Sequence, residues 1–171
     1  MATSKTPEDA ARWDAVEEAT ELLHEERYQD ALYLLRDVVK ADPGNPYGYY
    51  FIGAALYELG QLAPARDAYQ AAVRLSPGYV GARGSLAQVL RLLKDFRGAL
   101  REAEETLRLA PDDPDALHAL GLSYAALGNR GSARHYLEAF LRTRPEFEAA
   151  TEVARVLEML PLADGPLDPD D

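Results

Sequence analysis

The sequence predicts an all-α fold in which helix pairs follow one another along the chain, and three observations predict it. Four prolines recur with a fixed spacing of 34 residues: Pro43, Pro77, Pro111 and Pro145. An alanine stands twelve residues before each proline: Ala31, Ala65, Ala99 and Ala133. Between these markers, apolar residues recur at helical spacing. A fixed period of this length is typical of a solenoid of helix–turn–helix units.

Start and stop signals predict where the helices lie. Thr6 can cap a helix that begins at Pro7 and runs to about Glu25. The next helix starts near Tyr28 and ends before Pro43, because proline disfavours helix in the residue that precedes it. Asn45-Pro46 and Asp113-Pro114 repeat the start signal, and Gly60 can adopt the left-handed conformation that ends a helix. Further helices are expected over 62–75, 79–93 and 96–109. The fourth pair starts at Pro114, is broken at 128–129 and resumes to 143, and a last helix covers 147–160.

These signals divide the chain into seven parts. They are an N-terminal segment with the start of the first helix (1–11), four repeats (12–45, 46–79, 80–113 and 114–147), a capping helix (148–161) and a disordered acidic tail (162–171). The last helix has no partner, so we expect it to cover the apolar face of the fourth repeat. The tail is too rich in proline and aspartate to pack.

Composition excludes several classes of function. The formal net charge is -11, from 18 basic and 29 acidic residues, which argues against nucleic acid or an anionic membrane as the main partner. There is no cysteine, so disulfides, cysteine nucleophiles and cysteine-ligated metals are excluded. No apolar stretch approaches the roughly 20 residues of a membrane helix, and the N-terminus lacks a signal-peptide pattern. We expect a cytoplasmic protein.

Nothing in the sequence predicts an enzyme. The three histidines, His24, His118 and His135, have no partner at metal-ligand spacing, and no phosphate-binding loop or nucleophile elbow is present. Adjacent acids such as Glu104-Glu105 diverge by about 100° around a helix and are expected to be solvated. We therefore predict no catalytic residue, no metal and no cofactor.

The repeated residues resemble the tetratricopeptide repeat family, whose unit has the pattern W-x2-L-G-x2-Y, A-x3-F, P. The fourth repeat matches it best, with Leu117, Leu120-Gly121, Tyr124, Ala133, Leu137 and Pro145. The first repeat matches least, because Glu18 stands at an apolar position. The pattern places a small residue where the two helices of a repeat approach closely: Ala19, Gly53, Ala87 and Gly121. The resemblance implies a right-handed superhelix whose concave face is lined by the first helix of each pair.

The concave-face positions of the family give the candidate binding residues. We expect a peptide to contact Tyr47, Tyr50, Phe51, Tyr57, Gly84, Gln88, Arg91, His118 and Leu122. Tyr50 and Tyr57 are seven residues apart, two helical turns, and so form one stripe along their helix. Tyr57 and Arg91 occupy equivalent positions one repeat apart, so Arg91 is expected to flank that stripe. The Lys and Asn clamp with which some family members grip a chaperone's C-terminal carboxylate has no matching residue here.

Two interpretations of the aromatic residues stay open. They form the wall of an apolar groove for a peptide or helix, or they pack sideways as part of the core. Gly81 and Gly84 either leave a hollow beside that wall or give steric relief to Tyr47 and Tyr50.

The predicted function is protein–protein interaction. The chain is expected to serve as a scaffold, adaptor or holding chaperone that binds a peptide or helix of a partner protein. The alternative is a structural assembly subunit that associates through its convex face or last helix. A more specific version is a translocator-type chaperone of type III secretion, which the chain resembles in size, acidity and layout but not in its number of repeats.

Overall fold

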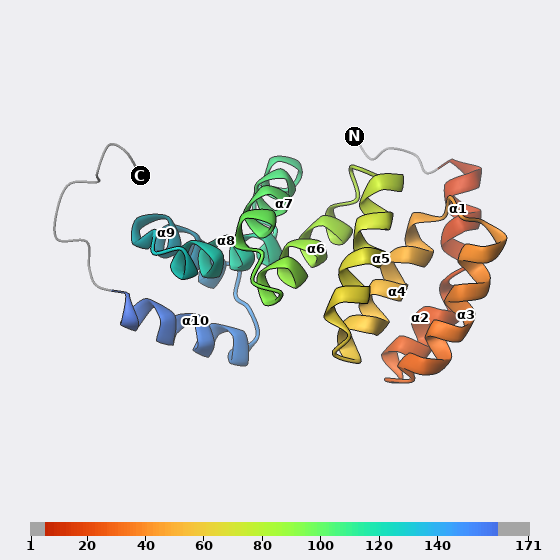
Figure 1. Ribbon diagram of the computed structural model, residues 1–171, viewed down its shortest axis with the longest axis horizontal. Coiled ribbons are helices and arrows are strands. Elements are labelled where there is room, and N and C mark those ends of the chain that lie inside the picture. The colour runs from red at the N-terminus through yellow and green to blue at the C-terminus, as the bar shows by residue number, and fades with distance from the viewer. Residues whose placement is uncertain (1–5, 161–171) are drawn as a thin grey trace. The chain divides into compact units, whose positions relative to one another are not determined.

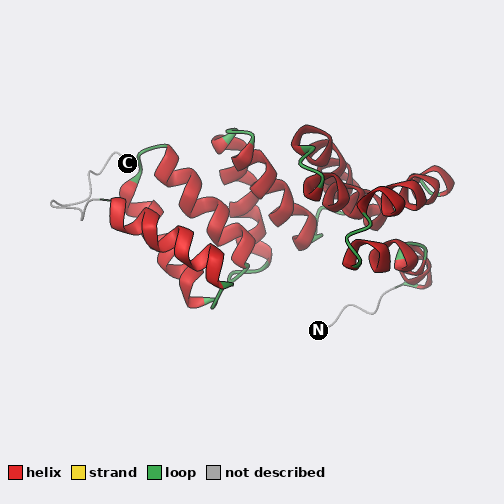
Figure 2. Cartoon of the chain, turned by 90° about the horizontal axis from the view of Figure 1, so that it is seen from below, coloured by secondary structure: helices red, strands yellow, loops and turns green. Residues whose placement is uncertain are grey.

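The computed structural model describes residues 6–160, and every regular element among them is an α-helix (Figures 1 and 2). The helices are α1 (Pro7–Asp14), α2 (Glu17–His24), α3 (Tyr28–Ala41), α4 (Pro46–Glu58), α5 (Leu62–Leu75), α6 (Val80–Leu92), α7 (Phe96–Leu109), α8 (Pro114–Ala126), α9 (Arg130–Arg142) and α10 (Phe147–Met159). The predicted all-α fold of helix pairs followed by a capping helix is confirmed. The predicted tail, 162–171, lies outside the described residues, as does Pro161.

Three helices begin at the capping signals that the sequence predicts. The Thr6 hydroxyl accepts a hydrogen bond from the backbone N–H of Asp9 at 3.1 Å. Asn45 Oδ1 accepts from Tyr47 and Gly48, and Asp113 Oδ1 accepts from Ala116 at 2.9 Å. Each cap precedes a proline at the first helical position. These bonds satisfy N–H groups that have no partner within the helix.

The first helix departs from the sequence prediction, because it is two helices and not one. The backbone N–H of Val16 donates to the carbonyl of Trp13 at 3.0 Å, three residues back, which tightens the turn between α1 and α2. Val16, at this turn, is fully buried, and Ala19 in α2 is also part of the core.

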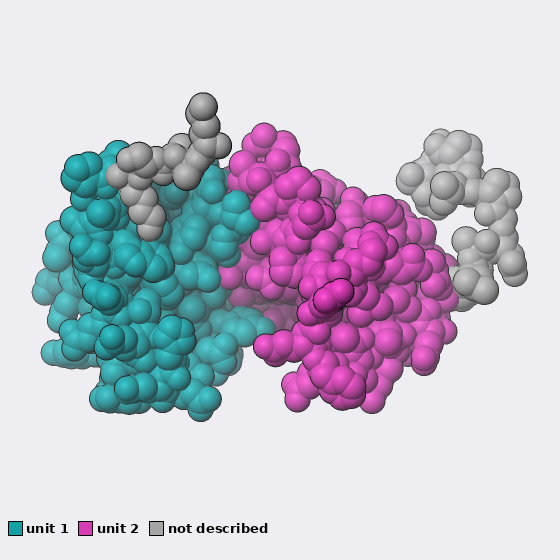
Figure 3. All heavy atoms as spheres, turned by 180° about the vertical axis from the view of Figure 1, so that it is seen from behind, with its two compact units in different colours: residues 1–82 teal, residues 83–171 magenta. Residues whose placement is uncertain are grey.

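The chain forms two compact units, residues 1–82 and 83–171 (Figure 3). In unit 1, α3 packs against α2 and α4, and α4 packs against α5. Its core holds Val16, Ala19, Ala31 and Leu35. Ala65, at the predicted close approach of two helices, is fully buried.

Unit 2 has two adjoining clusters of buried residues. The first consists of Ala87, Ala103, Ala116, Ala119 and Leu120, contributed by α6, α7 and α8. The second consists of Leu117, Leu137, Phe140 and Val153. Val153 comes from α10, so the last helix covers the apolar face that α8 and α9 present.

An ion pair joins α6 to α7 within unit 2. Arg83 Nη1 lies 2.6 Å from Glu102 Oε2, and both side chains are largely buried. Arg83 occupies the position at which the family pattern places a large tryptophan. Glu102 neutralises the charge of this arginine in its largely buried position.

The turns inside the four helix pairs share one backbone feature. A residue with positive φ recurs every 34 residues: Glu26 (58°), Gly60 (71°), Lys94 (64°) and Gly128 (82°). Gly60 thus adopts the predicted left-handed conformation. Glycine does so without steric cost, whereas Glu26 and Lys94 adopt it with a side chain.

Candidate functional site

The predicted site residues fall in both units. Unit 1 contributes four residues of α4: Tyr47, Tyr50, Phe51 and Tyr57. Unit 2 contributes five residues of α6 and α8: Gly84, Gln88, Arg91, His118 and Leu122. The expected relation between Tyr57 and Arg91 joins the two units and stays a prediction.

Most aromatic residues of unit 1 pack against one another in an aromatic cluster, which comprises Trp13, Tyr47, Tyr50, Phe51, Tyr69 and Tyr79. The ring centroids of Tyr50 and Tyr79 lie 5.0 Å apart, and those of Tyr47 and Tyr79 lie 5.5 Å apart. Trp13 meets Tyr47 edge-on at 5.1 Å. Such tilted and edge-on contacts are favourable for aromatic pairs. The cluster therefore fixes Tyr47, Tyr50 and Phe51 in place.

Hydrogen bonding and burial also hold the tyrosine hydroxyls of the cluster. The Tyr47 hydroxyl donates to Asp9 Oδ1 at 2.7 Å. Burial, together with this bond and the charge of Asp9, raises the pKa of Tyr47 to about 12. Burial likewise raises the pKa of Tyr79 far above its ordinary value. Both hydroxyls stay protonated and neutral at physiological pH, so the cluster carries no charge of its own.

Tyr57 differs from the other three aromatic candidates. It lies in the last turn of α4, outside the cluster, and its side chain is 38% exposed. A tyrosine with this exposure offers rigid apolar area and one hydroxyl to a ligand. Among the predicted aromatic residues, Tyr57 is the one that lies outside the internal packing.

The sequence left open whether the glycines of α6 leave a hollow or give steric relief, and the structure shows no hollow at Gly84. A Cβ placed on Gly84 would lie 3.3 Å from Asp113 Oδ1 and 3.3 Å from the Cβ of Asp115. Gly84 is buried under these residues, so the start of α8 fills the space beside it. A Cβ placed on Gly81 would meet Tyr79 at 3.4 Å and the Tyr50 hydroxyl at 3.8 Å, which is ordinary contact. The glycines are sites of helix packing in this structure.

Unit 2 brings three of the predicted residues into one hydrogen-bonded polar network: Gln88, Arg91 and His118. The Arg91 Nε–H donates to Gln88 Oε1 at 3.1 Å. Gln88 Nε2 lies 3.1 Å from the carbonyl oxygen of Asp115 and 3.0 Å from His118 Nδ1. Gln88 and His118 are 30 residues apart in the sequence, and the packing of α6 beside α8 brings them into contact.

The network determines the tautomer of His118. Arg91 Nε can only donate, so the Gln88 atom beside it is the oxygen. The Gln88 amide nitrogen therefore donates to the Asp115 carbonyl and to His118 Nδ1, which must accept. The proton of the neutral imidazole is then on Nε2, and this buried N–H has no hydrogen-bond partner among the described residues.

The surroundings of His118 keep it neutral. Its ring stacks on Phe140, with centroids 4.6 Å apart and planes 20° apart. Burial, and secondarily the positive charge of Arg91, lower the pKa of His118 to about 4. The network therefore carries one positive charge at neutral pH, on Arg91. Leu122, half-buried, lies one turn further along α8 on the same side as His118.

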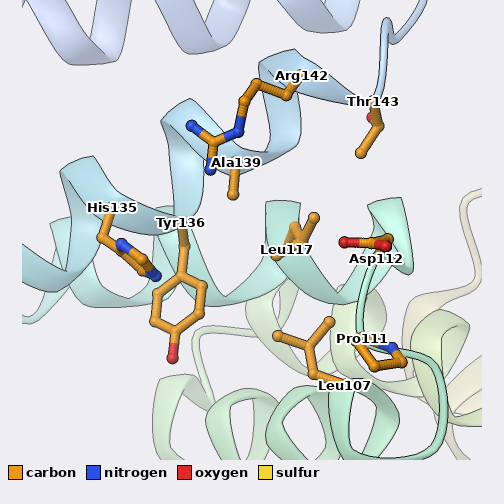
Figure 4. A pocket seen from close by; sticks show the side chains of 9 residues that line it. All are labelled: Leu107, Pro111, Asp112, Leu117, His135, Tyr136, Ala139, Arg142 and Thr143. Carbon is orange, nitrogen blue, oxygen red and sulfur yellow. The ribbon is translucent and has the colours of Figure 1, made fainter.

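A pocket that the sequence analysis missed lies between α7, α8 and α9 (Figure 4). It has a volume of about 570 Å³. Figure 4 shows His135 and Tyr136 at one side, Leu117 at the centre and Asp112 at the other side. Its lining residues come mostly from α7 and α9, the second helices of two successive repeats, with Leu117 of α8 and the loop that precedes it. The 34-residue period predicts that these helices are neighbours, but no motif marks the groove between them.

Residues 6–160 contain neither a cluster of metal ligands nor a membrane-spanning helix. Within that range no group of three or more His, Asp or Glu side chains is placed to hold a metal ion. Over the same residues, every helix is too short or too polar to span a bilayer.

Comparisons with known proteins identify the repeat. The family model described as "Tetratricopeptide repeat" matches residues 16–80, 85–129 and 118–165. A curated relative, a tetratricopeptide repeat and J domain-containing co-chaperone of Cryptococcus neoformans, is 27% identical over 125 residues, which are 73% of this chain and 23% of the relative. The chain spans less than a quarter of the length of the curated relatives it matches.

Two solved structures illustrate the similarity of fold. PilW, described as a type IV pilus biogenesis factor, has a TM-score of 0.77 at 21% identity, and the match covers 88% of this chain and 70% of PilW. YrrB, described as a tetratricopeptide repeat protein with an unusual peptide-binding site, has a TM-score of 0.70 at 23% identity, covering 80% of this chain and 71% of YrrB. At these identities the similarity shows the fold alone.

Proposed function

The chain belongs to the tetratricopeptide repeat family, and from this we propose that it binds a peptide or short helix of a partner protein. The proposed contacts are residues of α6 and α8 in unit 2 and, taken by itself, α4 in unit 1. The observation that carries the proposal is the polar network of Gln88, Arg91 and His118. It presents one oriented cation beside apolar side chains, an arrangement suited to a peptide ligand. The peptide-binding site named for YrrB supports the same class of ligand.

Each residue of the network has a distinct part in this proposal. Arg91 pairs with a carboxylate or backbone carbonyl of the ligand, because its planar guanidinium offers several donors. Gln88 orients Arg91, since its oxygen accepts from Arg91 Nε while its nitrogen is bonded to α8. His118 serves as a neutral support for Gln88. Tyr57 and Leu122 supply apolar contact, and the aromatic cluster holds α4 rigid.

We propose a binding role and not a catalytic one. Scaffold, adaptor and holding chaperone all fit a surface of this kind. The co-chaperone relative supports the last of these, as a protein that contains the same repeat. The translocator-type chaperone of type III secretion remains the narrower version of that role.

The experiment begins with the partner, which is captured by crosslinking pull-down from the native host. Binding is then measured by isothermal titration calorimetry for Tyr57→Ala and Arg91→Ala. Each should weaken binding by about 1–3 kcal/mol while the melting temperature stays within a few degrees. Arg91→Lys should recover only part of the loss, because lysine lacks the planar fork.

Arg101→Glu serves as the matched control, since Arg101 is an exposed arginine of α7 outside the network. Normal binding by Tyr57→Ala and Arg91→Ala, with loss of binding by Arg101→Glu, would overturn the proposal. That result would favour the alternative, an assembly subunit that associates through its convex face.

A further inference from the structure

The last helix carries the two most exposed large apolar side chains in the described part of the chain. Phe147, at the start of α10, is 84% exposed, and Met159, at its end, is 82% exposed. Val153, on the opposite side of the helix, is fully buried against α8 and α9. A helix that buries one face and ends in two exposed apolar residues has a second face suited to a partner.

This outer face is continuous between the two apolar ends. One groove of about 410 Å³ is lined by Phe147, Met159 and the residues of α10 that lie between them along the same face. The two ends are twelve residues apart, so the groove is about 18 Å long. A partner helix of about three turns would cover it from end to end.

The charge of this outer face is negative. Glu148, Glu152 and Glu158 are exposed on α10, and Arg155 is the one basic residue of that helix. None of these four side chains forms an ion pair within residues 6–160. The sequence that surrounds them adds to the charge, because residues 146–171 hold one basic and eight acidic side chains. The field favours a positively charged partner.

We propose that the outer face of α10 is a docking surface for a basic amphipathic helix of another protein. The partner presents two apolar residues roughly eleven or twelve positions apart, which contact Phe147 and Met159. Lysines or arginines between them pair with Glu148 and Glu152. The flexible thioether of Met159 can adapt to different apolar side chains, as methionines do at helix-binding surfaces.

Two other occupants fit the charges less well. A second copy packed antiparallel on the outer face, about a two-fold axis level with residue 153, would pair Phe147 of one copy with Met159 of the other. It would also place Glu148 of one copy against Glu158 of the other, twice per dimer. The chain's own residues 161–171 contain four aspartates and no basic residue, so they are repelled by the same glutamates. Charge complementarity therefore favours a separate, basic partner.

The test uses the full chain and a synthetic peptide probe. The peptide carries two leucines about eleven residues apart on one helical face, with lysines between them. A second peptide has the same composition with its leucines on opposite faces, and a third has glutamate in place of lysine. Fluorescence anisotropy at low and high salt gives each Kd. We expect the first peptide to bind at least about tenfold more tightly than the other two, and less tightly at high salt.

Two pairs of substitutions locate the site. Phe147→Ser with Met159→Ser should weaken binding of the first peptide at least about tenfold, and Glu148→Lys with Glu152→Lys should do the same and favour the glutamate peptide. Tyr33→Ser in α3 and Glu21→Lys in α2 are the matched controls, because each alters an exposed residue of the same type in unit 1. The controls should bind as the wild type does.

Several outcomes would overturn this inference. Equal binding of the first and second peptides, or unchanged Kd in both α10 double variants, would show that the attraction is nonspecific. Concentration-dependent dimerisation in sedimentation, abolished by Phe147→Ser, would assign the face to a second copy. Loss of peptide binding in Tyr57→Ala or Arg91→Ala would place the peptide at the other surface and leave the proposed function standing.

Discussion

The ring of Tyr69 lies directly against the backbone of Gly53. A Cβ placed on Gly53 would come within 2.7 Å of the Cδ1 and Cε1 atoms of that ring, and Tyr69 is only 4% exposed. Gly121 has the same relation to Leu137 in unit 2, where an added Cβ would meet the Leu137 backbone nitrogen at 3.0 Å. The close packing of α4 on α5, and of α8 on α9, depends on these missing side chains.

Gly53→Ala should lower the free energy of unfolding by about 1–3 kcal/mol, because the buried ring of Tyr69 has no space to move into. The gain in helix propensity of up to about 1 kcal/mol offsets only part of this cost. Urea denaturation measures the difference. Gly78→Ala is the control, since nothing lies within 4 Å of the added Cβ. Equal stability of the two variants would contradict the prediction.

Lys94→Gly should stabilise the protein by about 0.5–1 kcal/mol. Lys94 holds φ at 64°, a conformation that costs a residue with a side chain of the order of 1 kcal/mol. Glycine removes that cost, although it also gains freedom in the unfolded chain. Lys40→Gly, within α3, should instead destabilise by about 1 kcal/mol. The prediction fails if chemical denaturation shows both substitutions to be destabilising.

Arg83→Met should destabilise the protein by about 1–3 kcal/mol, because Glu102 is left without its partner in a largely buried position. The double variant Arg83→Met with Glu102→Met should recover a large part of the loss. Arg108→Met, which breaks the exposed pair with Glu105, should have a much smaller effect. Thermal unfolding of the four proteins decides; no recovery in the double variant would show that the two side chains are not coupled.

The stability of the protein should depend on His118 between pH 6.5 and 4. The pKa of His118 is lowered from 6.5 to about 4 in the folded chain. As the pH falls through this range, the unfolded chain takes up a proton that the folded chain does not, so stability decreases, by up to about 1.4 kcal/mol per pH unit. Above pH 6.5, His118 is neutral in both the folded and the unfolded chain, so this loss of stability is absent.

His118→Leu removes this titration, so its stability relative to the wild type should improve as the pH is lowered from 7.5 to 4.5. Urea unfolding at several pH values measures the stability of both proteins. A constant difference between wild type and His118→Leu across this range would refute the assignment.

Helix boundaries could be predicted wherever a proline, a cap or a glycine marks them. The bounds of α5 and α7 agree with prediction to the residue, and Thr6, Asn45 and Asp113 cap as expected. The break between α1 and α2 could not be foreseen, because no breaker residue stands at Ala15 or Val16. The burial of Val16 imposes it, and that is a tertiary constraint.

The candidate site was less accessible from the sequence. The period places Gln88 and His118 on neighbouring first helices, but their pairing depends on how closely α6 and α8 pack. The sequence left open whether the aromatic residues line a groove or pack together. The structure places Tyr50 in an aromatic cluster with Tyr79, and Tyr79 is outside the predicted face. The neighbours of Gly84, which are Asp113 and Asp115, could not be predicted for a similar reason, because only the fold brings them together.

The four left-handed turns are of two chemical kinds, although they recur at a single spacing. The first and third are formed by side-chain-bearing residues, Glu26 and Lys94, and the second and fourth by Gly60 and Gly128. The small residue at the close contact between the two helices of a pair alternates between alanine and glycine in the same order: Ala19, Gly53, Ala87 and Gly121. The backbone thus repeats every 34 residues, but the chemistry repeats every 68. An engineer who lengthens or shortens this chain should therefore add or remove two helix pairs at a time, because a single pair would bring two repeats of one kind into contact.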